Sequence, residues 1–497
     1  MREIRRSSVR LTLLVVLVAV APATAAVSAG AAATVDASAE ATTADPGVCV
    51  GHQAAPADGV TVVSVQGARF GENGGKEPAR LVAFGPRGEV LWVHDSSDSP
   101  GVVWSYDVDP LGNGNLFVTA TRRGTTLLYE LNTTTGDTVW TEELPYTDTH
   151  DADPLNESHV VIANMRNYDE ADETNEDRLV VYDRVDDEVT WTWQFDDHFD
   201  RDVGGSYTDD WTHFNDVDRV GDDFLLSPRN FDQVLLVDRA TGEIERQLGS
   251  DGNYDVLYEQ HNPDYLQSDA GTDTFLVADS ENDRIVEYEH TDGDWERTWR
   301  LGTSDTLSWP RDADRLRNGH TLVGDSKNHR VVEVTPRGEV VWEVYSPWLV
   351  YDVERIPAGG FESDAYADLG GSRGPTTTDL GADGSYELSG SGATPPSESE
   401  LTDCADALDD HEGGFGSVDL DATASPTGDG TDGGATADGT TDSERTAATT
   451  VPPRTDVTTV GGSGESTSGV VTPGLGVVVA AVALAVLAAV GLARRRD

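Results

Sequence analysis

Short apolar segments alternate with acidic turns throughout residues 60–357, and the pattern recurs at intervals of about 40 to 65 residues. Each unit begins with an acidic-hydrophobic strand and continues with two apolar strands. It ends with a turn and a strand that contains tryptophan. The opening strands lie at residues 106–109, 150–153, 215–218, 261–264, 311–314 and 351–354. Four short strands per unit at this period predict a β-propeller.

The number of units predicts how the ring closes. Five complete units occupy residues 105–347, and residues 350–356 supply one further opening strand without its outer strands. Suitable outer strands lie at residues 80–84 and 89–94. We therefore predict an all-β, six-bladed propeller in which N-terminal and C-terminal strands share one blade.

The repeat also allows the blades to be superimposed by sequence. In a propeller the first strand of each blade lines the central channel, and the residue three positions before the second acidic residue is the same place in every blade. These positions hold Tyr106, His150, Asn215, His261, Arg311 and Tyr351. Strand alternation predicts that His213, two residues before Asn215, faces the same side. Propeller channels are often wet and polar, but three of the 11 histidines gather here, which favours a functional site.

The acidic residues of the same strands receive a structural interpretation. Pairs such as Asp151 and Asp153 recur in the opening strands. We expect their carboxylates to accept backbone and turn hydrogen bonds within each blade, and we assign them no role in catalysis.

The charge balance excludes one class of function. The 497 residues contain 34 Lys+Arg and 90 Asp+Glu, for a formal net charge of −56. Such a chain would be repelled by a nucleic-acid backbone and is unsuited to electrostatic docking on an anionic membrane. Lys76 and Lys327 are the only lysines. A strongly acidic, lysine-poor chain resembles the proteins of halophilic archaea, whose hydrated surfaces stay soluble in concentrated salt.

The N-terminal residues are typical of an export signal. Residues 1–33 combine an arginine-rich start with a short apolar run at 11–20 and small residues suited to cleavage. Arg5 and Arg6 are compatible with a twin-arginine signal, and the choice between the Sec and Tat routes stays open. Residues 34–59 form a flank before the propeller.

The C-terminal residues predict a stalk and an anchor. Residues 358–470 are acidic and rich in Thr, Ser and Gly, which predicts a disordered flank and stalk. An apolar run at 475–492 precedes Arg494–Arg496 and is just long enough to span a bilayer. Residues 471–497 resemble the PGF-type sorting signal of haloarchaeal surface proteins, which is removed and replaced by a lipid. The alternative is a plain transmembrane anchor, and both place the body outside the cell, attached to its surface.

Two further features fit an exported protein. Cys49 and Cys404 lie on either side of the propeller, which is compatible with one disulfide joining the flanks. Two cysteines exclude a cysteine-rich zinc site. Asn132 and Asn156 begin N-glycosylation sequons.

The residues at the channel predict anion chemistry more readily than metal chemistry. Three histidines could hold zinc with one open position. However, Asn215 is a hydrogen-bond donor, and Arg229 and Arg311 are cations that would repel a metal ion. Donors and cations that converge on one point suit an oxyanion. We therefore predict no metal site.

Four motifs resemble those of the aryl sulfotransferases that work without a nucleotide sulfate donor. They are Thr149-His150-Asp151, Trp211-Thr212-His213-Phe214-Asn215-Asp216, Leu226-Ser227-Pro228-Arg229-Asn230 and Glu259-Gln260-His261. The resemblance covers roughly residues 60–357 and implies a six-bladed propeller with its active site in the channel. It implies that His261 becomes sulfated. It also implies that His150, His213, Asn215 and Arg229 surround the sulfuryl group, with Arg229 on the second strand of its blade.

The implied reaction is a two-step transfer without a cofactor. A neutral imidazole attacks the sulfur of an aryl sulfate, and a hydroxyl acceptor then takes the group from the sulfohistidine. Tyr106, Arg311 and Tyr351 complete the predicted substrate-binding set. The N-terminal β-sandwich and the disulfide near the active site of bacterial periplasmic members have no counterpart in the sequence.

A binding propeller without catalysis is the alternative. Residues 278–285 and 324–331 resemble blades of NHL-type repeats, and many such propellers only bind glycans or proteins. The histidine set favours the enzyme, because a binding module has no reason to place His261 beside His213 and Arg229.

Overall fold

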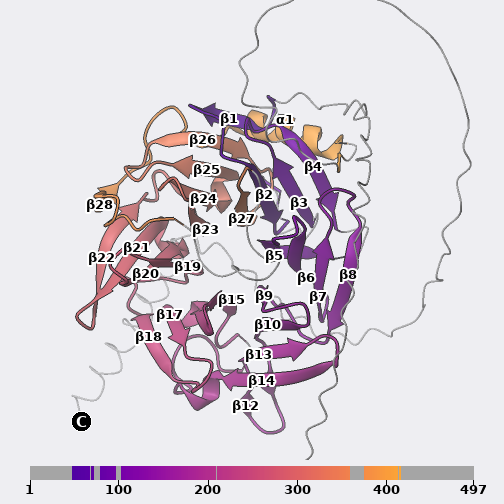
Figure 1. Ribbon diagram of the computed structural model, residues 1–497, viewed down its shortest axis with the longest axis vertical. Helices are drawn as coiled ribbons and strands as arrows, with labels where there is room; N and C mark the ends of the chain where they lie inside the picture. Colours follow the sequence, from indigo (N-terminus) through magenta and orange to yellow (C-terminus); the bar gives the residue numbers. More distant parts are fainter. Residues whose placement is uncertain are drawn as a thin grey trace, which may run out of the picture. The chain divides into compact units, whose positions relative to one another are not determined.

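The computed structural model describes seven segments of the chain, which are residues 47–67, 69–71, 79–96, 102–208, 210–358, 374–411 and 414–415. The predicted signal at 1–33, the anchor at 471–497 and most of the stalk lie outside these segments. Within them, six sheets of four or five strands stand around a common centre (Figure 1). No helix of the described segments is long and apolar enough to cross a membrane.

The blades follow one another along the chain. The first blade contains β5 (Trp104–Pro110), β6 (Leu116–Arg122), β7 (Thr125–Leu131) and β8 (Thr138–Leu144). The second contains β9 (Ala152–Pro154), β10 (His159–Asn164), β13 (Arg178–Asp183) and β14 (Glu188–Gln194), and the hairpin of β11 (Tyr168–Asp169) and β12 (Thr174–Asn175) is inserted in it. The third contains β15 (Phe214–Val220), β16 (Asp223–Pro228), β17 (Gln233–Val237) and β18 (Ile244–Gly249).

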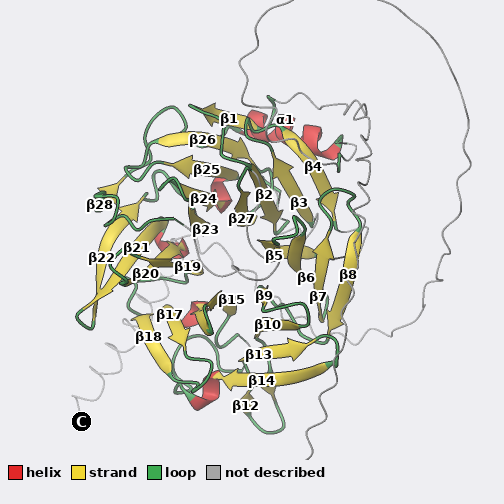
Figure 2. Ribbon diagram, viewed as in Figure 1, coloured by secondary structure: helices red, strands yellow, loops and turns green. Residues whose placement is uncertain are grey.

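The next two blades each acquire a fifth strand. The fourth contains β19 (His261–Gln267), β20 (Asp273–Asp279), β21 (Arg284–Thr291) and β22 (Asp294–Leu301), and β28 (Gly384–Tyr386) pairs parallel with β22. The fifth contains β23 (Pro310–Arg315), β24 (Thr321–Asp325), β25 (Arg330–Val334) and β26 (Val340–Tyr345), and β1 (Val50–Gln53) pairs with β26. Strands dominate the described segments, with single helical turns between some of them (Figure 2).

The sixth blade confirms the predicted closure of the ring. Its order is β27 (Val350–Ile356), β2 (Val60–Val65), β3 (Arg80–Phe84) and β4 (Val90–Asp95). The innermost strand therefore comes from the C-terminal side of the propeller and the other three from its N-terminal side. Val63 pairs with Val353 across this junction.

Part of the predicted stalk is ordered, which differs from the expectation of disorder over 358–470. Helix α1 (Glu398–Asp409) begins at Ser397, whose side chain accepts from the backbone N–H of Glu400 while the Glu400 carboxylate accepts from the Ser397 N–H. This reciprocal pair stabilises the first turn. One face of α1 buries Leu401, Cys404, Ala405 and Leu408. Cys404 forms a disulfide with Cys49, so the two flanks of the propeller are joined.

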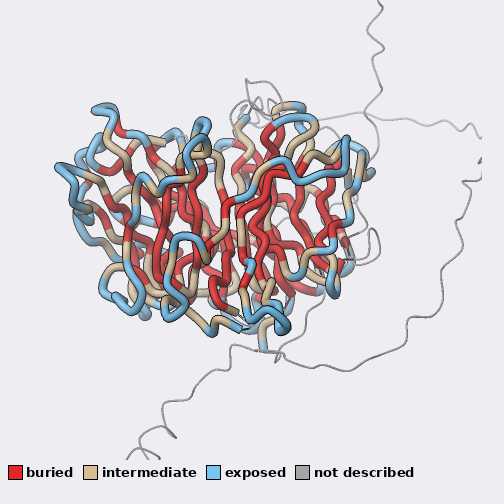
Figure 3. The backbone as a smooth tube through the Cα atoms, turned by 90° about the horizontal axis from the view of Figure 1, so that it is seen from below, coloured by how far each residue is buried: buried red, intermediate tan, exposed pale blue. Residues whose placement is uncertain are grey.

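Apolar side chains fill the spaces between neighbouring blades. One cluster combines Val161, Leu179 and Trp193 of the second blade with Val217 and Leu226 of the third. Figure 3 shows the buried backbone in the middle of the sheets and exposed loops at both rims. The ring is thus held by side chains that each sheet buries against the next.

The acidic residues of the innermost strands bond to the next blade, which corrects the expectation of bonds within each blade. Asp151 Oδ2 accepts from the Val217 N–H at 2.5 Å and Asp153 Oδ2 from the Arg219 N–H at 2.8 Å. The Val353 N–H donates to Asp312 Oδ2 and the Val108 N–H to Asp352 Oδ2, both at 2.9 Å. Innermost strands carry bulges in this region, and a bulge leaves N–H groups outside the ladder for the neighbour's carboxylate.

Candidate active site

The six residues superimposed by sequence converge on one end of the channel. Tyr106 stacks on His150 with ring centroids 4.1 Å apart, and Tyr351 meets Tyr106 edge-on at 5.0 Å. His261 lies 6.3 Å from the Tyr351 ring, and the Arg311 guanidinium carbon lies 5.1 Å from the same ring. All of these side chains are buried. We call this group, with His213 and Arg229, the channel mouth.

His213 reaches the mouth for a different reason from the one predicted. It precedes β15 and has φ 41°, so strand alternation does not orient it. The residues two positions before His150, His261 and Arg311 also have a positive φ, between 45° and 60°. They are Asp148, Glu259 and Trp309. This left-handed conformation is costly for residues other than glycine and clusters at functional sites. The residues in this conformation form a second layer around the mouth. Within it, the His213 ring lies 5.1 Å from the His150 ring, measured between centroids.

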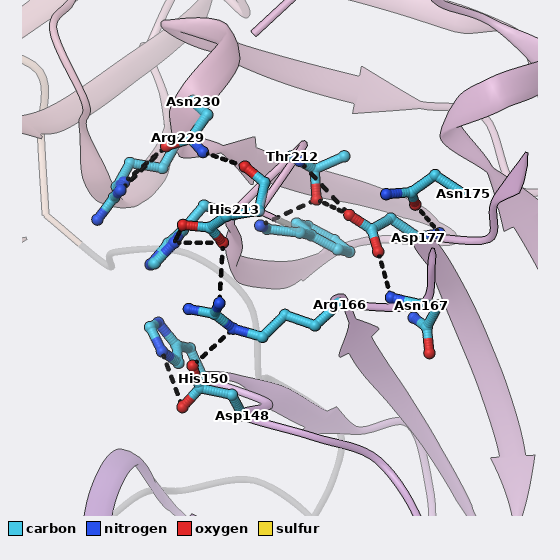
Figure 4. Close-up of polar contacts among 12 residues, drawn as sticks. Asp148, His150, Arg166, Asn167, Asn175, Asp177, Thr212, His213, Arg229 and Asn230 are labelled. Carbon is cyan, nitrogen blue, oxygen red and sulfur yellow. Dashed lines mark hydrogen bonds and ion pairs between the residues drawn. The ribbon is translucent and has the colours of Figure 1, made fainter. Parts of the chain in front are cut away.

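An arginine that the sequence analysis missed connects two of the histidines (Figure 4). Arg166 Nε donates to Asp148 Oδ2 at 2.8 Å, and Arg166 Nη1 lies 3.5 Å from Asp210 Oδ1. Asp148 in turn lies 3.8 Å from His150 Nε2, and Asp210 Oδ2 lies 2.9 Å from His213 Nδ1. One guanidinium thus holds the two carboxylates that stand behind His150 and His213.

This arrangement separates the charges at the mouth. Burial opposes ionisation of Asp148 and Asp210, but the hydrogen bonds from His150 and His213 and the charge of Arg166 outweigh it and lower the pKa of both carboxyls. Burial, followed by the charge of Arg229, lowers the pKa of His213 to about 3. At neutral pH the carboxylates are therefore ionised and the imidazole of His213 is uncharged. Because Asp210 can only accept, His213 Nδ1 carries the proton and Nε2 keeps its lone pair.

The two tyrosines use their hydroxyl groups inside the protein. The Tyr106 hydroxyl donates to Asp148 Oδ1 at 2.9 Å, and the Tyr351 hydroxyl donates to the Asn215 carbonyl at 3.1 Å. Burial raises the pKa of both phenols well above their usual value. These residues therefore form the aromatic wall of the mouth.

Arg229 lies just beyond the strand on which the sequence placed it. It is the first residue of a helical turn, η2 (Arg229–Phe231), that follows β16. The corresponding turns in the next two blades, η3 (Ser280–Asn282) and η4 (Ser326–Asn328), begin with serine. Arg229 Nη2 donates to Asn230 Oδ1 at 3.0 Å and lies 3.6 Å from Glu259 Oε2. The third blade thus has an arginine at the position where the fourth and fifth blades have serine.

Asn215 and Arg311 are each fixed by one neighbour. Asn215 Nδ2 donates to the Gln260 carbonyl at 3.0 Å, which leaves one further N–H on that amide. Arg311 Nη1 donates to Gln66 Oε1, and its guanidinium lies over the Trp309 ring with its carbon 3.9 Å from the centroid. Burial lowers the pKa of Arg311 to about 10, so it stays charged at neutral pH.

His261 has one nitrogen bound and one without a partner. Its Nδ1 lies 2.8 Å from the hydroxyl oxygen of Ser280, whereas Nε2 is buried and has no hydrogen-bond partner within the described segments. Burial lowers its pKa well below the usual value, with further contributions from the charges of Arg311 and Arg229. The imidazole is therefore neutral at pH 7, and Nε2 is its available nitrogen if Nδ1 carries the proton.

Four polar atoms at the mouth have no hydrogen-bond partner among the described residues. In the part of the chain that the structure describes, His150 Nδ1, Asn215 Oδ1, His261 Nε2 and Arg311 Nε are buried without a hydrogen-bond partner. Buried polar atoms are nearly always paired, so such a group calls for an explanation. A small polar ligand with acceptor oxygens and a hydroxyl would satisfy it. The described residues contain no cluster of His, Cys, Asp and Glu arranged to hold a metal ion.

The remaining predicted residues lie away from the mouth. Asn132 begins the turn between β7 and β8, where its side chain accepts from the backbone N–H groups of Thr134 and Thr135. Asn156 lies in the exposed turn between β9 and β10.

The fold and site define a propeller with histidines and arginines gathered at its channel mouth, and a family match agrees with this class. Residues 55–298 match the model of the arylsulfotransferase (ASST) family. The matched range contains His150, His213, Asn215, Arg229 and His261, and it ends before Arg311. No match to a curated protein was found.

Several solved structures are similar to this chain at low sequence identity. A protein of unknown function from Bacteroides caccae is 13% identical, with a TM-score of 0.41, over 60% of this chain and 98% of that one. A putative 6-phosphogluconolactonase from Bacteroides fragilis is 13% identical, with a TM-score of 0.38, over 60% and 98% of the two chains. Virginiamycin B lyase from Staphylococcus aureus is 12% identical, with a TM-score of 0.31, over 48% and 69%.

Proposed function

We propose that this protein is a sulfotransferase that moves a sulfuryl group from an aryl sulfate to a phenolic or other hydroxyl acceptor, with His261 as the nucleophile. The match to the arylsulfotransferase family supports sulfotransferase activity in general. The observation that carries the specific proposal is His261, a buried and neutral imidazole whose Nε2 has no partner in the described segments and which stands beside two guanidinium groups.

In the first step the lone pair of His261 Nε2 forms a bond to sulfur. The bond between sulfur and the aryl oxygen breaks, and the phenolate leaves with the electron pair. The sulfuryl group spreads negative charge over its oxygens in the transition state. Arg229 and Arg311 would stabilise that charge, because fixed cations in a water-poor site act strongly on developing charge.

In the second step an acceptor hydroxyl attacks the sulfur and the bond to Nε2 breaks, which returns the electron pair to the imidazole. The proton lost by the acceptor balances the proton that the phenolate gains. Asn215 Oδ1 and His150 Nδ1 are unpaired acceptors at the mouth and would orient the incoming hydroxyl. Both half-reactions use one site, and neither requires a nucleotide.

The test is transfer activity of wild type and His261→Asn in concentrated salt. We expect wild type to release a coloured phenol from its sulfate ester when a second phenol is present, and to carry one sulfuryl group on His261 by mass spectrometry. His261→Asn should do neither. His290→Asn, in an outer strand of the same blade, is the matched control and should stay active.

The propeller fold by itself fits the alternative of a non-catalytic propeller that binds glycan or protein. Folded wild type that binds aryl sulfates, releases no phenol and gains no mass on His261 would support that alternative. Full activity in His261→Asn would remove the nucleophile assignment.

We also propose that the propeller lies outside the cell and is held at its surface through residues 471–497. The support is the order of sequence features, with an export signal at 1–33 and an apolar run before an arginine cluster. Deleting 471–497 should release the protein into the medium. Retention of the truncated protein in the membrane fraction would contradict this.

A further inference from the structure

A buried serine stands behind the proposed nucleophile, on the side away from Nε2. Ser280 is the first residue of η3 and is fully buried. Its hydroxyl oxygen lies 2.8 Å from His261 Nδ1 and 2.6 Å from the carbonyl oxygen of Pro310 in the next blade. A serine hydroxyl has one hydrogen to donate and two lone pairs to accept with.

The Pro310 carbonyl decides where that hydrogen goes. A carbonyl oxygen can only accept, so two oxygens at 2.6 Å are held together by the serine hydrogen. The hydroxyl oxygen is then left to accept, and His261 Nδ1 must be the donor. Since the imidazole is neutral, its single N–H is on Nδ1, and Nε2 keeps the lone pair.

The fifth blade shows that the serine bond exists without a histidine. Ser326 occupies the same position in η4, is equally buried, and donates to the Val350 carbonyl at 2.6 Å. The residue at the position of His261 in that blade is Arg311. The bond from serine to the next blade therefore belongs to the fold, and the fourth blade adds a histidine to it.

We propose that Ser280 is the positioning residue of the transfer reaction, because it fixes His261 in the Nδ1–H tautomer and so presents the Nε2 lone pair to sulfur. This inference rests on the proposed function. When Nε2 bonds to sulfur and the phenolate leaves, the ring becomes an imidazolium. Ser280 cannot take the Nδ1 proton away, because its own hydrogen is bonded to a carbonyl that is not a base.

The sulfohistidine consequently keeps its positive ring. When the bond from sulfur to Nε2 breaks, the electron pair neutralises this ring, so neutral imidazole leaves. Neutral imidazole is a better leaving group than the imidazolate that would leave if Nδ1 had lost its proton. The second half-reaction benefits directly. A carboxylate in place of Ser280 would compensate the ring charge and slow that second step.

The experiment compares Ser280→Ala with Ser326→Ala, its matched control, in the full-length protein. Both remove one buried hydroxyl that ties two blades, so we expect a similar fall in melting temperature. Only Ser280→Ala should slow single-turnover sulfation of His261, by roughly 10- to 100-fold, the size found when an orienting partner of a metal-bound histidine is removed. The KM for the aryl sulfate should change little. Ser280→Thr, which keeps the hydroxyl, should restore the rate.

A second measurement does not depend on activity. Nitrogen-15 spectra of histidine-labelled protein, with His261→Asn to assign the signal, should show the proton of His261 on Nδ1 in wild type and a mixture in Ser280→Ala. Wild type that carries the proton on Nε2 would overturn the proposal, as would equal rate losses in Ser280→Ala and Ser326→Ala. Absence of phenol release and of sulfohistidine in wild type, with the Nδ1 proton in place, would instead overturn the proposed function.

Discussion

The channel mouth and the channel wall below it are built from the same innermost strands, and they are used in opposite ways. At the wall, Asp151, Asp153, Asp312 and Asp352 all accept a backbone hydrogen bond from the next blade. At the mouth, one to three residues away along the strand, the side chain differs between neighbouring blades, except that Tyr351 and Tyr106 are both tyrosine. The repeated positions hold the ring together, and the varied positions supply chemistry.

The two regions also treat protons in opposite ways. Burial raises the pKa of Asp151 to about 6 and those of Asp153 and Asp312 to about 7. At the mouth, burial lowers the pKa of His213 to about 3, and hydrogen bonds from His150 and His213, with the charge of Arg166, lower the pKa of the Asp148 and Asp210 carboxyls. Near pH 7, Asp153 and Asp312 at the wall therefore remain partly protonated, whereas the imidazoles of His213 and His261 at the mouth are neutral, as a nucleophilic imidazole requires.

Replacing Arg229 with Met should have the largest effect on this contrast. It removes a cation from the mouth and leaves the wall unchanged, so transfer should fall by about 10²–10³-fold, the usual loss for one donor to a developing anion. Phenol release under saturating donor measures it. Arg239→Met, in the turn between β17 and β18 of the same blade, should retain activity, and an equal loss there would show that the effect is structural.

Arg166→Gln should have a smaller effect, because it acts through other residues. Asp148 and Asp210 lose their shared guanidinium, and the pKa of His150 rises because a nearby positive charge disappears. We expect the acidic limb of the pH–activity profile to move to higher pH. Loss of the hydrogen bond to Asp148 and of the ion pair with Asp210 should lower the free energy of unfolding by about 1–3 kcal/mol. An unchanged pH profile with reduced stability would limit Arg166 to a structural role.

The smallest expected effect is on the pH dependence of stability. A raised folded-state pKa at Asp153 stabilises the protein fully below the unfolded value of about 4, and the contribution is lost as pH rises through about 7. A lowered pKa at His213 acts oppositely, and its contribution is lost as pH falls below about 6.5.

The melting temperature of Asp153→Asn should therefore rise relative to that of wild type as pH rises from 4 to 8. His213→Gln should gain relative to wild type as pH falls over the same range. Asp294→Asn, an exposed change in β22, serves as the control and should show neither trend. Parallel curves for Asp153→Asn and wild type would mean that the wall does not retain protons.

The sequence predicted the blades, their number and the convergence of the mouth because the repeat records which positions are equivalent. It missed Arg166 because the β11–β12 insertion interrupts the repeat there, so no other blade has an equivalent position. It missed Asp148 and misjudged His213 because a left-handed backbone leaves no periodic pattern. The partners of Asp151 and Asp153 depend on how one sheet is placed against the next, which a single strand does not reveal.

The C-terminal helix was missed for a compositional reason. Its buried face needs only four small or apolar residues, and the flanking sequence is acidic and rich in Thr, Ser and Gly. A helix this polar is not stable from its own hydrophobic content. It depends on the capping box and on contact with the propeller, neither of which is evident from composition.

The shared sixth blade sets the order in which the protein can fold. Val63 must find Val353, and β27 can pair with β2 only after almost the whole propeller has been synthesised. Contacts between such distant residues slow folding, because the entropy of closing a long loop is lost before the contact forms. The four consecutive strands of each of the first five blades have local pairings and can form earlier, so closure of the sixth blade completes the ring. The disulfide from Cys49 to Cys404 belongs to the same apolar cluster as Val63 and Val353. It then fixes the closed ring with a covalent bond.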